Sequence, residues 1–110
     1  MEKVTVSYKQ RVVDNLNKKL HQLYKDEWFG FIEDAQNYVD KIYDYIDYKL
    51  PYAIHKKSTP KNKKFGQYYT YYKANKSTTW FTFFNRKRNS FIIKNIFSNH
   101  AAKASFLNEL

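Results

Sequence analysis

The chain contains no cysteine, and it has only two glycines and two prolines among its 110 residues. The absence of cysteine excludes disulfide scaffolds, cysteine-based zinc sites and thiol catalysis, and it is typical of a reducing cytoplasm. The scarcity of glycine excludes a glycine-rich phosphate-binding loop, and no low-complexity linker divides the chain. No apolar run resembles a secretion signal or a membrane span. We therefore expect a single cytoplasmic domain that covers residues 1–110.

Acidic residues are missing from one long stretch of the sequence. Between Tyr48 and Asn108 there is no aspartate or glutamate, and nine of the ten acidic residues precede position 48. The same stretch carries thirteen lysines and arginines, so its net charge is +13. A folded surface without carboxylates cannot screen its own positive field, and it attracts a polyanion or an acidic protein partner.

Two amphipathic helices are predicted in the first half of the chain. A short alternating strand over residues 3–7 precedes them, and Ser7 is typical of the residue that opens a capping box. The first helix then extends to about Lys25, and a second helix, capped by Asp26, ends at Pro51. Its apolar residues repeat every three to four positions, and its opposite face is acidic. The two helices are expected to form an antiparallel hairpin.

Three aromatic strands are predicted after a basic loop that covers residues 51–64. The strands cover residues 65–73, 78–84 and 90–97, and the short turns between them require neighbouring strands to run antiparallel. The predicted fold is therefore α+β. An N-terminal strand leads into a helical hairpin, which packs on one face of an antiparallel sheet with three C-terminal strands.

This element order, together with the chain's size and basicity, resembles the RelE/ParE superfamily of bacterial toxins from type II toxin–antitoxin systems. The opening VTVSYKQRVVDNLNKKL is similar to the family's first strand and helix, with its acidic-apolar pattern at Asp14 to Leu16. The ending IIKNIFSNH places His100 where the RNase branch of the family often carries a histidine. The resemblance implies a RelE-like fold over Val4 to His100 and a cognate acidic antitoxin as partner.

The RNase branch implies a ribosome-dependent, metal-independent mRNA endoribonuclease. Such cleavage needs an acid and a base, and His100 can serve as either. The family usually carries an arginine on its middle strands, which lack one here, so Arg86 and Arg88 in the predicted turn are the candidates that stabilise the phosphate charge. No cofactor is expected, and the three histidines are too far apart in sequence to suggest a metal site. The lysines expected to bind RNA are Lys56, Lys57, Lys61, Lys63, Lys64, Lys87 and Lys94.

Two alternatives stay open. A gyrase-inhibiting toxin of the ParE kind needs no catalytic residues, so the missing strand arginines do not count against it. A non-enzymatic basic accessory protein that binds nucleic acid would need only charge and exposed rings. The aromatic residues of the predicted strands are too numerous to lie on one face of the sheet. Because side chains alternate between the two faces, some aromatic rings lie on the face away from the helices, where unpaired bases can stack on them.

Overall fold

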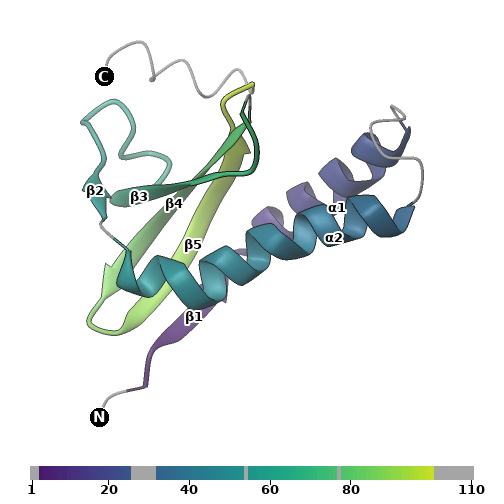
Figure 1. Ribbon diagram of the computed structural model, residues 1–110. Coiled ribbons are helices and arrows are strands. Elements are labelled where there is room, and N and C mark those ends of the chain that lie inside the picture. The colour runs from purple at the N-terminus through teal and green to yellow at the C-terminus, as the bar shows by residue number, and fades with distance from the viewer. Residues whose placement is uncertain (1–2, 26–31, 54, 77, 101–110) are drawn as a thin grey trace.

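The computed structural model describes residues 3–25, 32–53, 55–76 and 78–100 of the chain (Figure 1). Within these residues the chain forms two α-helices and a five-stranded sheet, which confirms the predicted α+β class. The strands are β1 (Thr5–Tyr8), β2 (Lys56–Lys57), β3 (Tyr68–Lys73), β4 (Thr79–Lys87) and β5 (Ser90–Ser98). The helices are α1 (Gln10–Lys25) and α2 (Ile32–Asp44), and α2 continues into a π-helical turn, η1 (Tyr45–Lys49), and a 3-10 turn, η2 (Leu50–Tyr52).

The sheet is mixed, and the prediction of a wholly antiparallel sheet is wrong at one pair of strands. The strand order is β1-β5-β4-β3-β2, and the neighbours among β2 to β5 run antiparallel. β1 instead pairs with β5 in parallel, with Thr5 opposite Ser90 and Tyr8 opposite Ile93. Parallel strands need a long crossover connection, and the chain between β1 and β5, which holds both helices and the strands β2 to β4, supplies it.

The structure also corrects several element boundaries. Ser7 lies within β1, so it does not cap α1, which begins at Gln10. The predicted cap at Asp26 lies outside the described residues. Pro51 lies inside the turn η2 rather than after the helix, and the predicted basic loop contains the short edge strand β2. These differences arise because long-range pairing, which local turn signals do not report, decides where a short strand forms.

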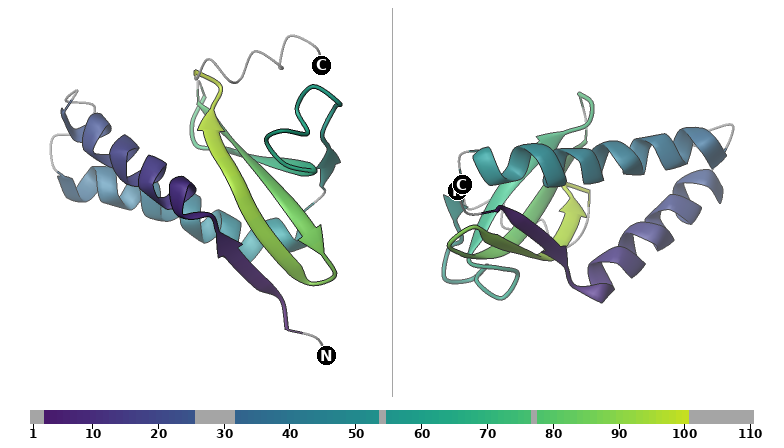
Figure 2. Two further views of the ribbon diagram at one scale, coloured as in Figure 1. Left: turned by 180° about the vertical axis from the view of Figure 1, so that it is seen from behind. Right: turned by 90° about the horizontal axis from the view of Figure 1, so that it is seen from below.

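The helices cover one face of the sheet and extend beyond it (Figure 2). α1 and α2 lie side by side and run in opposite directions, as the predicted hairpin requires (Figure 1). The predicted apolar repeat of the second helix is confirmed within the described residues, because Ala35, Val39 and Ile42 of α2 and Ile46 of η1 are all buried. The core between helices and sheet consists of Val12, Leu16, Ile42, Ile46, Leu50, Trp80, Phe84, Phe91 and Ile93.

Tyrosine hydroxyls connect the helical layer to the sheet. Tyr8 in β1 donates a hydrogen bond of 2.6 Å to the carboxylate of Asp47 in η1. The Trp80 ring N–H donates to the hydroxyl of Tyr38 over 2.8 Å. Burial raises the pKa of Tyr8 well above its usual value, and the hydrogen bond to Asp47 raises it further. Burial also raises the pKa of Tyr38 and that of Tyr43.

We expect the free energy of unfolding to fall as the pH rises above about 10. In the unfolded chain a tyrosine ionises near pH ~10, whereas Tyr8 stays protonated in the folded state because its pKa is raised. The stabilisation is therefore complete below the unfolded pKa and is lost as the pH rises toward the folded one. Urea unfolding between pH 8 and pH 11 measures this decline. The Tyr8→Phe variant, which has no phenolic proton, should decline less steeply than the wild type, and an equal decline would contradict this account.

Candidate nucleic-acid interface

β4 contributes aromatic side chains to both faces of the sheet. Trp80 and Phe84 pack against the helices, whereas Phe81 and Phe83 belong to a separate cluster on the opposite face. This division follows from the alternation of side chains along a strand. We call the face away from the helices the outer face. Its aromatic side chains are Phe65, Tyr69, Tyr71, Phe81, Phe83 and Phe97.

The loop of residues 58–66 covers one part of the outer face. Phe65 packs against Phe83 and Phe97, with ring centroids 5.4 and 5.3 Å apart. The buried Ser58 hydroxyl donates to the carbonyl of Gly66 over 2.6 Å, which closes the loop. Gly66 is required here, because a Cβ at this position would lie 2.8 Å from the backbone nitrogen of Phe84. The loop therefore lies directly on β4 and holds its lysines beside the outer face.

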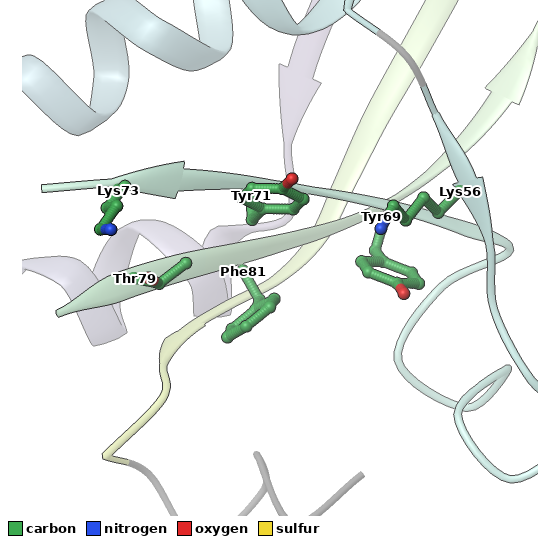
Figure 3. Close-up of a pocket in the computed structure, with 6 residues that line it drawn as sticks. All are labelled: Lys56, Tyr69, Tyr71, Lys73, Thr79 and Phe81. Atoms are coloured by element: carbon green, nitrogen blue, oxygen red, sulfur yellow. The ribbon is translucent and has the colours of Figure 1, made fainter. Parts of the chain in front are cut away.

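The rest of the outer face forms an open cleft of about 330 Å³ (Figure 3). We call it the aromatic cleft, and its lining consists of Lys56, Tyr69, Tyr71, Lys73, Thr79 and Phe81. Figure 3 shows Lys56 reaching in from β2 at one end and Lys73 lying at the other end, with Tyr71 between them. Tyr71 is 50% exposed, and the Lys56 ammonium lies 5.4 Å from the centroid of its ring. The cleft thus combines an accessible ring with two flanking cations.

The sheet itself carries no carboxylate that could weaken the positive electrostatic field of these two lysines. Every residue of β2 to β5 and of their connecting loops falls in the stretch between Tyr48 and Asn108 that has no aspartate or glutamate. The acids of α2 belong to the other layer, and Asp34 among them lines a cavity on the helix side of β3 with Tyr72 and Ala74. A concave, apolar surface with one sign of charge concentrates that field, so the cleft favours an anionic ligand with flat apolar groups.

His100 lies just beyond the end of β5 and is exposed. Its Nε2 atom lies 3.2 Å from the Thr78 hydroxyl, and its backbone N–H donates to the Ser98 hydroxyl over 3.3 Å. Lys73 lies at the same end of the sheet, because its partner in β4 is Thr79. The imidazole therefore contacts Thr78 at the same end of the sheet as Lys73, but neither His100 nor Thr78 is among the residues that line the aromatic cleft.

The structure does not bring Arg86 and Arg88 together with His100. Arg86 pairs with Phe91 at the far end of the β4–β5 hairpin, seven residues along β4 from Thr79, which is roughly 20 Å. Arg86 belongs to the strand rather than to a turn, and it donates from Nε to the carbonyl of Arg88 over 2.9 Å. Its guanidinium lies 5.2 Å from the Phe91 ring, on the helix side. In this fold these arginines cannot contact a phosphate that His100 also reaches.

The lysines predicted to bind RNA fall into three groups. Lys56 and Lys57 form β2, and the loop that follows carries Lys61, Lys63 and Lys64 beside the outer face. Lys87 lies at the β4–β5 turn with the two arginines. Lys94 is the extra residue of a bulge in β5, where the partners of Phe83 and Phe84 are Asn95 and Ile93.

Sequence reasoning did not single out Lys73 or Thr79 as site residues. Their neighbours carry a signal that points to them, because Tyr69, Tyr71 and Lys73 alternate along β3 and therefore share one face. That signal can be used only when it is known which of the two alternating sets of side chains faces the helices; we call this the phase of the strand. Only the packed structure supplies this phase, since both alternating sets on β3 and β4 are aromatic.

Comparison with known proteins identifies no relative. No protein-family model, curated protein or solved structure matches this chain. The described part of the chain contains no group of three or more histidine, aspartate or glutamate residues that could hold a metal ion. None of the helices in the described ranges is long and apolar enough to cross a membrane. Function must therefore be argued from the geometry of the aromatic cleft.

Proposed function

We propose that this protein binds single-stranded RNA across the outer face of its sheet and acts as an RNA-directed toxin of the RelE/ParE kind, a ribosome-dependent mRNA endoribonuclease. The observation that carries the proposal is the aromatic cleft, in which Lys56 and Lys73 flank the exposed ring of Tyr71. The matching order of strand, hairpin and C-terminal strands supports the family resemblance.

Single-stranded RNA fits the cleft better than a duplex does. Unpaired bases can stack on an exposed aromatic ring, whereas the bases of an A-form duplex are paired and inaccessible to it. The two lysines lie on either side of Tyr71, so they can contact the phosphates on both sides of a base that stacks there. Stacking on the aromatic ring does not select among the four bases, because each base presents a flat π-face.

His100 is the residue that we assign to cleavage. Attack by a 2′-hydroxyl on the neighbouring phosphate needs a group that accepts its proton or protonates the leaving oxygen. His100 is exposed at the end of the sheet where Lys73 completes the cleft, and Thr78 fixes its orientation. Because Arg86 and Arg88 lie at the far end of the hairpin, the developing phosphate charge would be met by Lys73 instead.

We expect substitutions in the cleft to weaken RNA binding in two distinguishable ways. Lys56→Ala and Lys73→Ala should each reduce the slope of log affinity against log salt by about 0.7, the contribution of one phosphate contact on a single strand. Tyr71→Ala should cost about 1–3 kcal/mol of binding free energy with little change in the slope, because it removes a stacking surface. Fluorescence anisotropy with a labelled oligouridylate at several salt concentrations measures both quantities.

The matched control for this measurement is Lys18→Ala, which removes an exposed lysine from α1, away from the outer face. It should leave both the affinity and the salt slope close to the wild-type values. If the control weakens binding as much as Lys56→Ala or Lys73→Ala does, the RNA is attracted by net charge alone and the cleft is not the site.

Expression of the wild-type protein in a bacterial host should arrest growth and translation. The His100→Ala variant, expressed at the same level, should restore both, while His21→Ala, which changes an exposed histidine on α1, should remain toxic. Growth curves and amino-acid incorporation measure the outcome. Equal toxicity of the His100→Ala variant would contradict the catalytic assignment. DNA-damage signalling without loss of translation would indicate the gyrase-directed alternative, and RNA binding without any growth defect would indicate the accessory protein.

A further inference from the structure

A second cavity lies on the helix side of β3, across the strand from the aromatic cleft. Its volume is about 390 Å³, which is enough for a small molecule. Its lining consists of Asp34, Asn37, Tyr38 and Lys41 of α2, together with Tyr72 of β3 and the following Ala74. We call it the α2 cavity. Unlike the aromatic cleft, it is lined by charges of both signs.

The charged groups of the α2 cavity stand at its two ends along the helix. Asp34, Asn37 and Lys41 share one face of α2, because they are spaced three and four residues apart. The seven residues from Asp34 to Lys41 correspond to roughly 10.5 Å along the helix axis. Asn37 lies between them. The helix therefore presents a carboxylate, an amide and an ammonium group in that order.

The polar groups that line the α2 cavity do not bind one another. Within the described part of the chain, the side chains of Asp34, Asn37 and Lys41 form no hydrogen bond or ion pair. The Tyr72 hydroxyl also has no hydrogen-bond partner among these residues. It is accessible from the cavity, because every buried side-chain oxygen or nitrogen in the described ranges has a partner. All four groups are thus available to a ligand.

Contacts with the core hold the aromatic wall of the α2 cavity in place. The Tyr38 hydroxyl accepts a hydrogen bond of 2.8 Å from the ring N–H of Trp80. The Tyr72 ring stacks on Tyr45, with centroids 5.2 Å apart, and the Tyr45 hydroxyl lies 3.0 Å from that of Thr70. The wall is therefore formed before a ligand binds, which lowers the entropic cost of binding.

We propose that the α2 cavity binds a dipeptide in its zwitterionic form. Asp34 would accept hydrogen bonds from the terminal ammonium group, and Lys41 would donate to the terminal carboxylate. The Asn37 side chain can both donate to and accept from the peptide group between these ends. An extended dipeptide is roughly 7 Å long. With a charge-assisted hydrogen bond of about 2.8 Å at either end, it spans the two charged side chains, and the flexible lysine adjusts the fit.

Other small ligands fit the α2 cavity less well. Asp34 repels a phosphate or a nucleotide, and one carboxylate supplies too few oxygen ligands for a divalent cation. A single α-amino acid carries both of its charges on one carbon, too close together to meet Asp34 and Lys41 at once. A dipeptide in this cavity requires no RNA-directed activity, because the aromatic cleft lies on the opposite face of β3.

Titration with alanyl-alanine, followed by NMR of the backbone amides, tests this proposal. We expect saturable shifts at Asn37, Lys41 and Tyr72. N-acetylation of the probe removes its ammonium group, and amidation removes its carboxylate. Each change should weaken binding roughly tenfold, the effect of one lost charge-assisted hydrogen bond. Absence of saturable shifts at these residues, or equal binding of the two capped probes and the free dipeptide, would overturn the proposal.

Substitutions in α2 assign the two ends of the ligand. Asp34→Asn should bind alanyl-alanine roughly tenfold more weakly and should no longer distinguish it from the acetylated probe. Lys41→Gln should likewise lose the distinction from the amidated probe. The matched control is Glu33→Gln, which changes an exposed acid of α2 that does not line the cavity and should bind as the wild type does.

Two results with these variants would contradict the assignment, provided that circular dichroism shows each variant to be folded. One is that Asp34→Asn and Lys41→Gln still distinguish the capped probes from the free dipeptide. The other is that Glu33→Gln weakens binding as much as Asp34→Asn does. Because this assay contains no RNA, its result is independent of the RNA-binding measurement.

Discussion

The structure depends on a central strand that buries large side chains on both of its faces. β4 directs Trp80 and Phe84 toward the helices, and it directs Phe81 and Phe83 toward the outer face. A single helical layer can cover only one side of a sheet, so the outer side chains need another source of contacts. The loop of residues 58–66 covers Phe83 through Phe65, but it does not extend over the whole face. The aromatic cleft is what remains where β3 and β4 extend past this loop, and the ring of Tyr71 is exposed there for that reason.

The two layers of the fold also separate the charges. Asp40 and Asp44 are exposed on α2, and Asp47 of η1 bonds to Tyr8, whereas the only charged residues of the sheet are lysines and arginines. The charge asymmetry in the sequence therefore becomes an asymmetry between two layers of one domain. Because the helices lie between most of these acids and the outer face, the acids screen its positive field only weakly. The same surface thus suits RNA, which presents negative charge together with flat bases.

Local patterns in the sequence predict the α+β class, both helices and the approximate positions of three strands. The buried residues Val39, Ile42 and Ile46 follow directly from helical periodicity. The parallel pairing of β1 and the two-residue strand β2 escape prediction because they depend on partners far away in sequence. The candidate site is predicted less well for the same reason. Arg86 is near His100 in sequence, but the register of the hairpin places the two at opposite ends. The contribution of Lys73 becomes visible only when the phase of β3 relative to the helices is known.

The central claim is that the outer face of the sheet, rather than positive charge in general, binds single-stranded RNA. Chemical-shift mapping by NMR with an oligouridylate tests it most directly, because each backbone amide reports its own surroundings. The account predicts saturable shifts at Lys56, Tyr71, Lys73 and Phe81, with little change on the exposed side of α2. Shifts confined to the β4–β5 turn at residues 86–88, or spread evenly over every exposed lysine, would contradict it.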